Sequence, residues 1–184
     1  MKQVIYDLNF DDLKEYLEKN GIKAFHGKQI FKWLYEKRVK TFDLMSDLPI
    51  KLREKLEEDF TIPSLELVTK QVSSDGTTKY LFKLEDGPYV ESVLMIFDYG
   101  NSACLSTQVG CNMGCSFCAS GLLKKQRNLS VGEIVLQVLQ IQIYLDERDE
   151  RLGNLVLMGT GEPFDNYDNV MKALAIINHP FALE

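Results

Sequence analysis

Three of the four cysteines stand close together, with a spacing that can bind metal. Cys111, Cys115 and Cys118 form the pattern C-x-x-x-C-x-x-C in a glycine-containing segment. Three thiolates can bind three irons of a cubane 4Fe-4S cluster, and the fourth iron then has no protein ligand. An iron with open coordination can bind the amino and carboxylate groups of S-adenosylmethionine (SAM) and pass one electron to its sulfonium. The spacing therefore favours chemistry that begins with a deoxyadenosyl radical.

A closed zinc site is the main alternative to the cluster. Structural zinc usually takes four Cys or His ligands in paired spacings, and no second pair is present here. His26 and His179 are far from the segment in sequence, and Cys104 lies seven residues before Cys111. Three cysteines without a metal are the least expected, because exposed thiols are readily oxidised. The residues therefore favour a cluster over zinc, and zinc over no metal.

A second motif, Gly159-Thr160-Gly161-Glu162-Pro163, follows an expected strand. Taken alone, a glycine turn with one carboxylate is typical of a plain connection between a strand and a helix. Both motifs, however, come directly after consecutive expected strands, at the edge where α/β barrels place their active sites. The cysteine segment resembles the signature of radical SAM enzymes, and the turn resembles their GGEP-like element. This resemblance implies that Gly161 and Glu162 contact SAM.

The apolar pattern predicts the elements that carry these motifs. Between residues 11 and 60 apolar side chains recur at helical spacing, which indicates short helices joined by tight turns. Between residues 65 and 96 the period is two, and Asp75-Gly76 and Asp86-Gly87 stand where hairpin turns are expected. We therefore expect a helical domain over residues 1–64 and a connecting β-hairpin segment over residues 65–96.

Strand and helix patterns alternate after Asn101. Strands are expected at residues 103–109 and 154–158, and helices from the Ser130/Glu133 capping box to about Leu145 and over residues 167–177. This alternation predicts parallel strands. The fold class is therefore α/β, and residues 97–184 are expected to form the first half of a radical SAM (β/α) barrel. A complete barrel takes ~200 residues or more, so the barrel is expected to be incomplete in this sequence.

Four further segments resemble the RlmN family, which methylates carbon 2 of adenine in 23S ribosomal RNA and in the anticodon loop of transfer RNA. They are FHGKQIFKWLY at residues 25–35, VESV at 90–93, ACLSTQVGC at 103–111 and RNLS at 127–130. The resemblance implies that the helical domain over residues 1–64 is of the RNA-binding type. It also implies a 4Fe-4S cluster and SAM as cofactors, an electron donor such as flavodoxin or ferredoxin, and a monomer at full length. A Cfr-like enzyme acting on adenine carbon 8 shares these motifs and remains open.

The resemblance implies a role for two further residues. One SAM methylates a cysteine, and a second SAM yields the radical that activates this methyl group for addition to adenine. Glu91 is then the proton acceptor, and Cys104 is the thiol that releases the RNA by forming a disulfide. On a strand, Glu91 shares a face with Tyr89 and Val93, so we expect it to be partly desolvated with a raised pKa. Without the resemblance, a lysine-paired glutamate and a small buried cysteine are the simpler interpretations.

The methyl-carrying cysteine is expected in a C-terminal part that this sequence lacks. We therefore expect these 184 residues to be inactive alone. Two other classes remain open, a zinc-stabilised RNA-binding module and a non-catalytic remnant.

Charge and composition restrict the partners. The net charge of −6 argues against RNA binding through a general positive field, and the whole deficit falls after Leu65. Candidate phosphate contacts are local: Lys28 and Lys32, four residues apart, and Lys124, Lys125 and Arg127 after the cysteines. A solvated helix face explains Lys28 and Lys32 equally well. No apolar run approaches the ~20 residues of a membrane span and no secretory leader is recognisable, so a cytoplasmic protein is expected.

Overall fold

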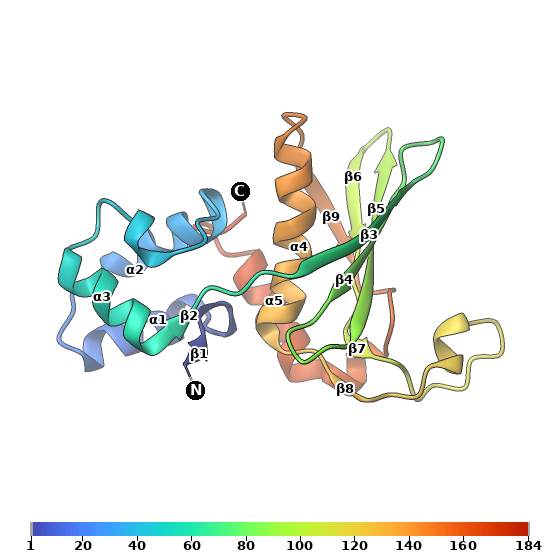
Figure 1. Ribbon diagram of the computed structural model, residues 1–184, viewed down its shortest axis with the longest axis horizontal. Helices are drawn as coiled ribbons and strands as arrows, with labels where there is room; N and C mark the ends of the chain where they lie inside the picture. Colours follow the sequence, from blue (N-terminus) through green and yellow to red (C-terminus); the bar gives the residue numbers. More distant parts are fainter. Residues whose placement is uncertain (1, 184) are drawn as a thin grey trace. The chain divides into compact units, whose positions relative to one another are not determined.

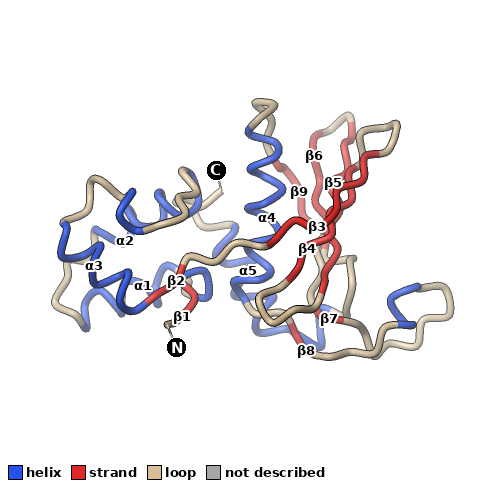
Figure 2. The backbone as a smooth tube through the Cα atoms, in the orientation of Figure 1, coloured by secondary structure: helices blue, strands red, loops and turns tan. Residues whose placement is uncertain are grey.

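The computed structural model describes residues 2–183, which group into two compact units. The first unit contains the residues up to Ser64 together with those from Met171 onward, and the second contains Leu65–Val170. Figure 1 follows the elements in chain order, and Figure 2 separates helices from strands. No helix within residues 2–183 is both long and apolar enough to cross a membrane.

The first unit is helical, as the apolar spacing predicts. It contains α1 (Phe10–Lys19), α2 (His26–Phe31) continued by a π-helical turn (Lys32–Glu36), and α3 (Ile50–Asp59). Short 3-10 turns (Ile5–Asp7 and Phe42–Leu44) and a parallel pair of two-residue strands, β1 (Gln3–Val4) and β2 (Phe60–Thr61), complete it. Most of the apolar residues that recur at helical spacing are buried, among them Leu13, Leu17, Ile30, Leu34, Leu52 and Leu56. Tyr16 and Trp33, which share this spacing, are only partly buried.

The second unit is built on a five-stranded sheet in the order β3-β4-β5-β6-β9. Its strands are β3 (Glu66–Val72), β4 (Thr78–Lys83), β5 (Tyr89–Phe97), β6 (Gly100–Cys104) and β9 (Leu152–Val156). The pairs from β3 to β6 are antiparallel, with the expected turns at Asp75-Gly76 and Asp86-Gly87, whereas β6 and β9 are parallel. The α/β class is therefore confirmed. Within residues 2–183 the sheet does not close into a barrel.

Two predicted strands were placed wrongly. The strand expected at residues 103–109 is divided into β6, which begins earlier, and β7 (Gln108–Val109), while β9 begins and ends two residues before the expected strand. The division occurs because the backbone of Ser106 bonds to a side chain: its N–H donates to Oε1 of Gln137 at 2.9 Å, and its carbonyl accepts from Nε2 at 3.0 Å. Within the described part of the chain, the backbone of Ser106 therefore makes no hydrogen bonds of the strand-pairing type, and the strand is interrupted there.

Helix α4 (Val131–Asp146) packs on one face of this sheet. Tyr144 makes an edge-on ring contact with Tyr80 of β4, and Gln137 accepts a hydrogen bond from Ser92 of β5 at 2.7 Å. Helix α5 (Tyr167–Ile177) follows after a 3-10 turn (Pro163–Asn166), and both of its predicted bounds are confirmed. The first residues of α5 group with the second unit, and those from Met171 onward with the first.

The predicted capping box of α4 is confirmed. The backbone N–H of Glu133 donates to Oγ of Ser130 at 3.2 Å, and the backbone N–H of Ser130 donates to Oε2 of Glu133 at 2.8 Å. We expect Ser130→Ala to lower the free energy of unfolding by about 1 kcal/mol, because it removes one partner of these helix donors. Urea denaturation monitored by circular dichroism measures the loss. Ser46→Ala, which changes an exposed serine, should leave the midpoint unchanged within error.

Candidate active site

The cysteine loop, residues 110–126, is closed at its base by a short ladder. Strand β7 pairs with β8 (Arg127–Asn128), the N–H of Cys111 donates to the carbonyl of Leu123 at 2.9 Å, and that of Gln126 donates to Val109 at 2.8 Å. Gly110 adopts a φ of +73°, and a Cβ at this position would lie 2.2 Å from the carbonyl oxygen of Lys124. Glycine is therefore required where the two arms of the loop meet.

The three cysteines occupy the outer part of this loop. Cys115 and Cys118 are exposed, Cys111 is partly buried, and the N–H of Cys118 donates to the carbonyl of Cys115 at 3.1 Å. Hydrogen bonding by Ser120 lowers the pKa of the Cys118 thiol. All four cysteines are free thiols, so the disulfide that the resemblance implies is absent from this structure.

The donor set of the loop fits an iron-sulfur cluster. Residues 110–126 contain three thiols and no His, Asp or Glu. Thiolates alone are the usual ligands of such clusters, whereas Cys104 would have to join them for a four-thiolate zinc site. Within residues 2–183 no three His, Cys, Asp or Glu side chains gather in a metal-binding arrangement, so the thiols are not converged here.

The predicted SAM turn lies beside the strand end that leads into the cysteine loop. The N–H of Gly159 donates to the carbonyl of Leu105 at 3.0 Å, and the carbonyl of Thr160 accepts from Thr107 and Gln108 at 2.9 and 3.2 Å. At Gly161 the φ is +112°, and a Cβ would lie 2.6 Å from Cβ of Gln108. The two motifs, about 50 residues apart in sequence, are thus joined by hydrogen bonds through residues 105–108.

Two hydrogen bonds hold Glu162 in place. Its N–H donates to Oε1 of Gln108 at 3.0 Å, and its Oε1 accepts from the N–H of Phe164 at 3.0 Å. The carboxylate therefore caps the 3-10 turn that precedes α5. This structural role is compatible with the predicted SAM contact, because one carboxylate oxygen accepts no hydrogen bond in these contacts.

Glu91 and Cys104 lie on the sheet face opposite α4. Val93 is the register partner of Cys104, and Glu91 is two residues from Val93 on the same face. The expected alternation is confirmed, since Val90, Ser92 and Leu94 of β5 are buried while Glu91 is exposed. Burial raises the pKa of the Cys104 thiol, partly offset by a hydrogen bond from the backbone of Met158.

The expected desolvation of Glu91 was wrong. Its side chain is 48% exposed, and its Oε1 lies 3.2 Å from Nζ of Lys79. Lys79 belongs to the same face, because it is the register partner of Val93. The simpler interpretation of the sequence, a glutamate paired with a lysine, is therefore the arrangement found.

A cavity of about 920 Å³ is lined by Glu91, by residues of the cysteine loop that flank the cysteines, and by Thr160 of the SAM turn. Its wall includes Glu91, the hairpin turn of Asp86 to Tyr89, Gly110, Thr160 and most of residues 119–126. The lining includes Lys124 and Lys125 but not the three loop cysteines, Cys104, Gly161 or Glu162. An anionic ligand that entered this cavity would therefore meet two lysines on one side and Glu91 on another.

The candidate phosphate contacts differ in their surroundings. Lys28 and Lys32 are exposed, away from buried Ile30 and Leu34, but Nζ of Lys28 lies 4.6 Å from the ring centroid of Phe181 and Lys32 pairs with Glu36 at 3.7 Å. In the second unit, Lys124 is exposed and Lys125 pairs with Asp165 at 3.7 Å.

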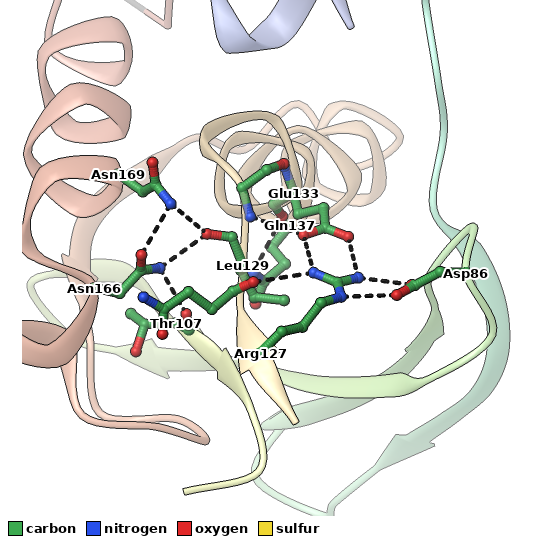
Figure 3. A network of polar contacts seen from close by, with 10 residues as sticks. Asp86, Thr107, Arg127, Leu129, Glu133, Gln137, Asn166 and Asn169 are labelled. Carbon is green, nitrogen blue, oxygen red and sulfur yellow. Dashed lines mark hydrogen bonds and ion pairs between the residues drawn. The ribbon is translucent and has the colours of Figure 1, made fainter. Parts of the chain in front are cut away.

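Arg127 has a structural explanation instead. Its guanidinium bonds to Asp86 and to Glu133 (Figure 3). A phosphate would have to displace one of these carboxylates.

Cys104 is expected to react more slowly than Cys115 with a thiol-alkylating reagent. The thiolate is the reactive form, and burial raises the pKa of Cys104 while Cys115 is exposed. A raised pKa leaves less thiolate at a given pH. The alkylation rate of Cys104 should therefore still increase with pH at values where the alkylation rate of a cysteine with an ordinary pKa no longer changes. Peptide mass spectrometry of metal-free protein across pH 7 to 10 measures both rates. Equal rates and equal midpoints would contradict this account.

Comparison with known proteins shows which family the chain resembles. The model described as "Ribosomal RNA large subunit methyltransferase N-terminal domain" matches residues 4–62, and that of the "Radical SAM superfamily" matches residues 105–183. A "Probable dual-specificity RNA methyltransferase RlmN" of Listeria monocytogenes is 55% identical over 180 residues, which are 97% of this chain and 49% of the relative. Along nearly its whole length the chain is therefore similar to proteins of the RlmN family. It spans about half the length of the curated relatives it matches.

Two further comparisons show the same similarity. The protein of the same description from Bacillus velezensis is 54% identical over 175 residues, covering 95% of this chain and 48% of the relative. The crystal structure of a radical SAM methyltransferase from Sphaerobacter thermophilus is 38% identical, has a TM-score of 0.89, and is matched over 98% of this chain and 53% of that chain. The RlmN-type motifs thus occur in a chain whose fold is similar to that of a radical SAM methyltransferase.

Proposed function

We propose that the protein containing this chain is a radical SAM methyltransferase that modifies carbon 2 of adenine in 23S ribosomal RNA and in the anticodon loop of transfer RNA. The cavity carries the proposal, because Glu91, the second arm of the cysteine loop and Thr160 of the SAM turn all line it. Carbon 2 of adenine is an electron-poor position that polar attack on the SAM methyl group does not reach. A bound 4Fe-4S cluster and SAM would supply the one-electron chemistry.

The roles of the residues follow from their chemistry. Cys111, Cys115 and Cys118 would hold the cluster, and Gly161 and Glu162 would contact SAM. Glu91 would accept the ring proton, since a carboxylate that is half exposed and lines the cavity can reach a substrate. Cys104, on the same face, would be the thiol that releases the RNA.

The RNA would be held by local positive charge. Lys124 and Lys125 line the cavity and would contact phosphates near the target adenine. Lys28 and Lys32 on the exposed side of the helical unit would contact other phosphates of the RNA. Each phosphate contact that is removed should lower the magnitude of the slope of log binding constant against log salt concentration by about one. An electron donor of the flavodoxin or ferredoxin class would reduce the cluster.

Metal analysis tests the first step of this proposal. After anaerobic reconstitution, the protein at the length of its relatives should contain about four irons and four sulfides, the content of a cubane cluster. Cys115→Ala should lose the cluster and SAM cleavage, whereas Cys104→Ala should keep both. Zinc in place of iron would support the non-catalytic module instead. Iron and sulfide without SAM cleavage would support the remnant.

The methylated position tests the second step. Mass spectrometry of nucleosides from the treated RNA separates 2-methyladenosine from 8-methyladenosine. Methylation at carbon 8 would establish the Cfr-like alternative, which uses the same cysteine loop. Synthetic fragments of 23S RNA and of transfer RNA anticodon stems, offered separately, would then show whether both are substrates.

A further inference from the structure

The Arg127 side chain uses every donor of its guanidinium group within the second unit. Nε and Nη2 donate to the two carboxylate oxygens of Asp86 at 2.7 and 2.6 Å. Nη1 and Nη2 donate to the two oxygens of Glu133 at 2.8 and 2.7 Å, and Nη1 also donates to the carbonyl of Asn128 at 3.1 Å. A guanidinium has five N–H donors, so this arrangement is saturated. Figure 3 shows the side chain lying between the two carboxylates.

The three charged residues come from three different parts of the site. Asp86 lies in the hairpin turn between β4 and β5, which lines the cavity. Arg127 lies in β8, opposite Val109 at the base of the cysteine loop. Glu133 belongs to the capping box of α4. One side chain therefore connects a wall of the cavity, the base of the loop and the start of a helix.

The backbone beside Arg127 is fixed from the other side by two asparagines. Nδ2 of Asn166, which is 4% exposed, donates to the carbonyls of Thr107 and Leu129 at 2.8 and 2.9 Å. Nδ2 of Asn169 donates to the same Leu129 carbonyl at 3.0 Å (Figure 3). Arg127 thus projects from a backbone segment held in place, and its partner Asp86 is on a turn, the more mobile kind of element.

The charges reinforce one another. Hydrogen bonds from Arg127 hold the pKa of Asp86 below its usual range, and Glu133 and Asp86 together raise the pKa of Arg127. The side chain of Arg127 is 32% exposed, so solvent weakens these contacts only partly.

From this geometry we propose that Arg127 is a positioning residue that fastens the Asp86 turn to the base of the cysteine loop and so holds the cavity beside Glu91 in shape. The inference rests on the function proposed above and deepens it. In this inference Arg127 holds the wall of the cavity in place and does not contact the RNA phosphates.

Hydrogen exchange of the full-length protein loaded with its cluster tests the positioning directly. Arg127→Lys and Asp86→Asn should each speed exchange of the amides in residues 84–90 and 110–126 by about tenfold, because bidentate contacts between charged groups are lost. Arg148→Lys is the matched control. Arg148 pairs with Glu150 at 3.6 Å at the surface of the same unit, and its change should leave both segments unaffected.

Kinetics and RNA binding distinguish positioning from a phosphate contact. Lysine keeps the positive charge but loses the bidentate geometry, so positioning predicts that Arg127→Lys lowers kcat about as much as Asp86→Asn does, by about tenfold, with the KM for RNA changed less than about twofold. A phosphate contact predicts the reverse. Arg127→Lys would then leave kcat and the KM for RNA nearly unchanged, and Asp86→Asn would strengthen RNA binding by removing a competing negative charge.

Two results would overturn the inference: unchanged exchange in both segments, or the binding pattern of a phosphate contact. Failure of the proposed function remains distinguishable, because a wild-type protein that does not methylate RNA still reports on the Asp86 turn through its exchange rates.

Discussion

Replacing Glu91 with glutamine is expected to lower the rate of RNA methylation by about two to four orders of magnitude, the usual contribution of a general base. Glutamine keeps the size of the side chain but cannot accept a proton. SAM cleavage and RNA affinity should be retained, because the cysteine loop and the lysines are unchanged. A single-turnover assay on an RNA fragment, followed by nucleoside mass spectrometry, measures the rate.

Glu66 provides the matched control for Glu91. It is also a glutamate of the five-stranded sheet paired with a lysine, with Lys83 at 3.7 Å, but it lies on β3 and does not line the cavity. Glu66→Gln should keep the wild-type rate within about twofold, since surface ion pairs contribute little. A Glu91→Gln protein with the rate of Glu66→Gln would remove Glu91 from the chemistry.

Replacing Gln137 with leucine is expected to lower the free energy of unfolding by about 3 kcal/mol. The side chain is fully buried and accepts from Ser92 Oγ and from the Ser106 N–H, while its Nε2 donates to the carbonyl of Ser106. Leucine leaves these buried polar groups without partners. The effect should extend to the site, because Oγ of Ser106 donates to the carbonyl of Glu91 at 2.6 Å and accepts from the N–H of Thr160 at 3.0 Å.

Gln140 is a suitable control on the same helix because it is partly exposed. Gln140→Leu should change the free energy of unfolding by less than about 0.5 kcal/mol, the usual range for surface substitutions. Urea titrations of both variants at pH 7 give the comparison. Equal destabilisation by the two leucines would mean that helix packing, and not the lost hydrogen bonds, sets the stability.

Local patterns were sufficient to predict most of the elements. The period of 3.6 located α1 and α3, the Ser130/Glu133 signature located the start of α4, and the two Asp-Gly pairs located the turns of the hairpins. These features depend on residues a few positions apart, whose geometry is determined by the backbone. The parallel pairing of β6 with β9 also followed from the alternation of strand and helix.

Features that depend on residues distant in sequence were not predictable in the same way. The interruption after β6 is caused by Gln137, which is 31 residues away from Ser106. The exposure of Glu91 depends on which sheet face α4 covers, and alternation along one strand does not determine this. The saturation of Arg127 required the turn at Asp86 and the start of α4 to meet, 41 and 6 residues away. The basic residues Lys124, Lys125 and Arg127, seen only as neighbours in the sequence, did not indicate that Arg127 pairs with two carboxylates.

The short ladder of β7 and β8 has a consequence for the maturation of the protein. Because the loop is tied at its base by backbone contacts and the outer thiols face solvent, iron and sulfide could be delivered after the sheet has formed. A metallocentre lost to oxygen would then be replaceable without unfolding the chain. Replacement of the proposed cluster would then require only a local opening of residues 110–126.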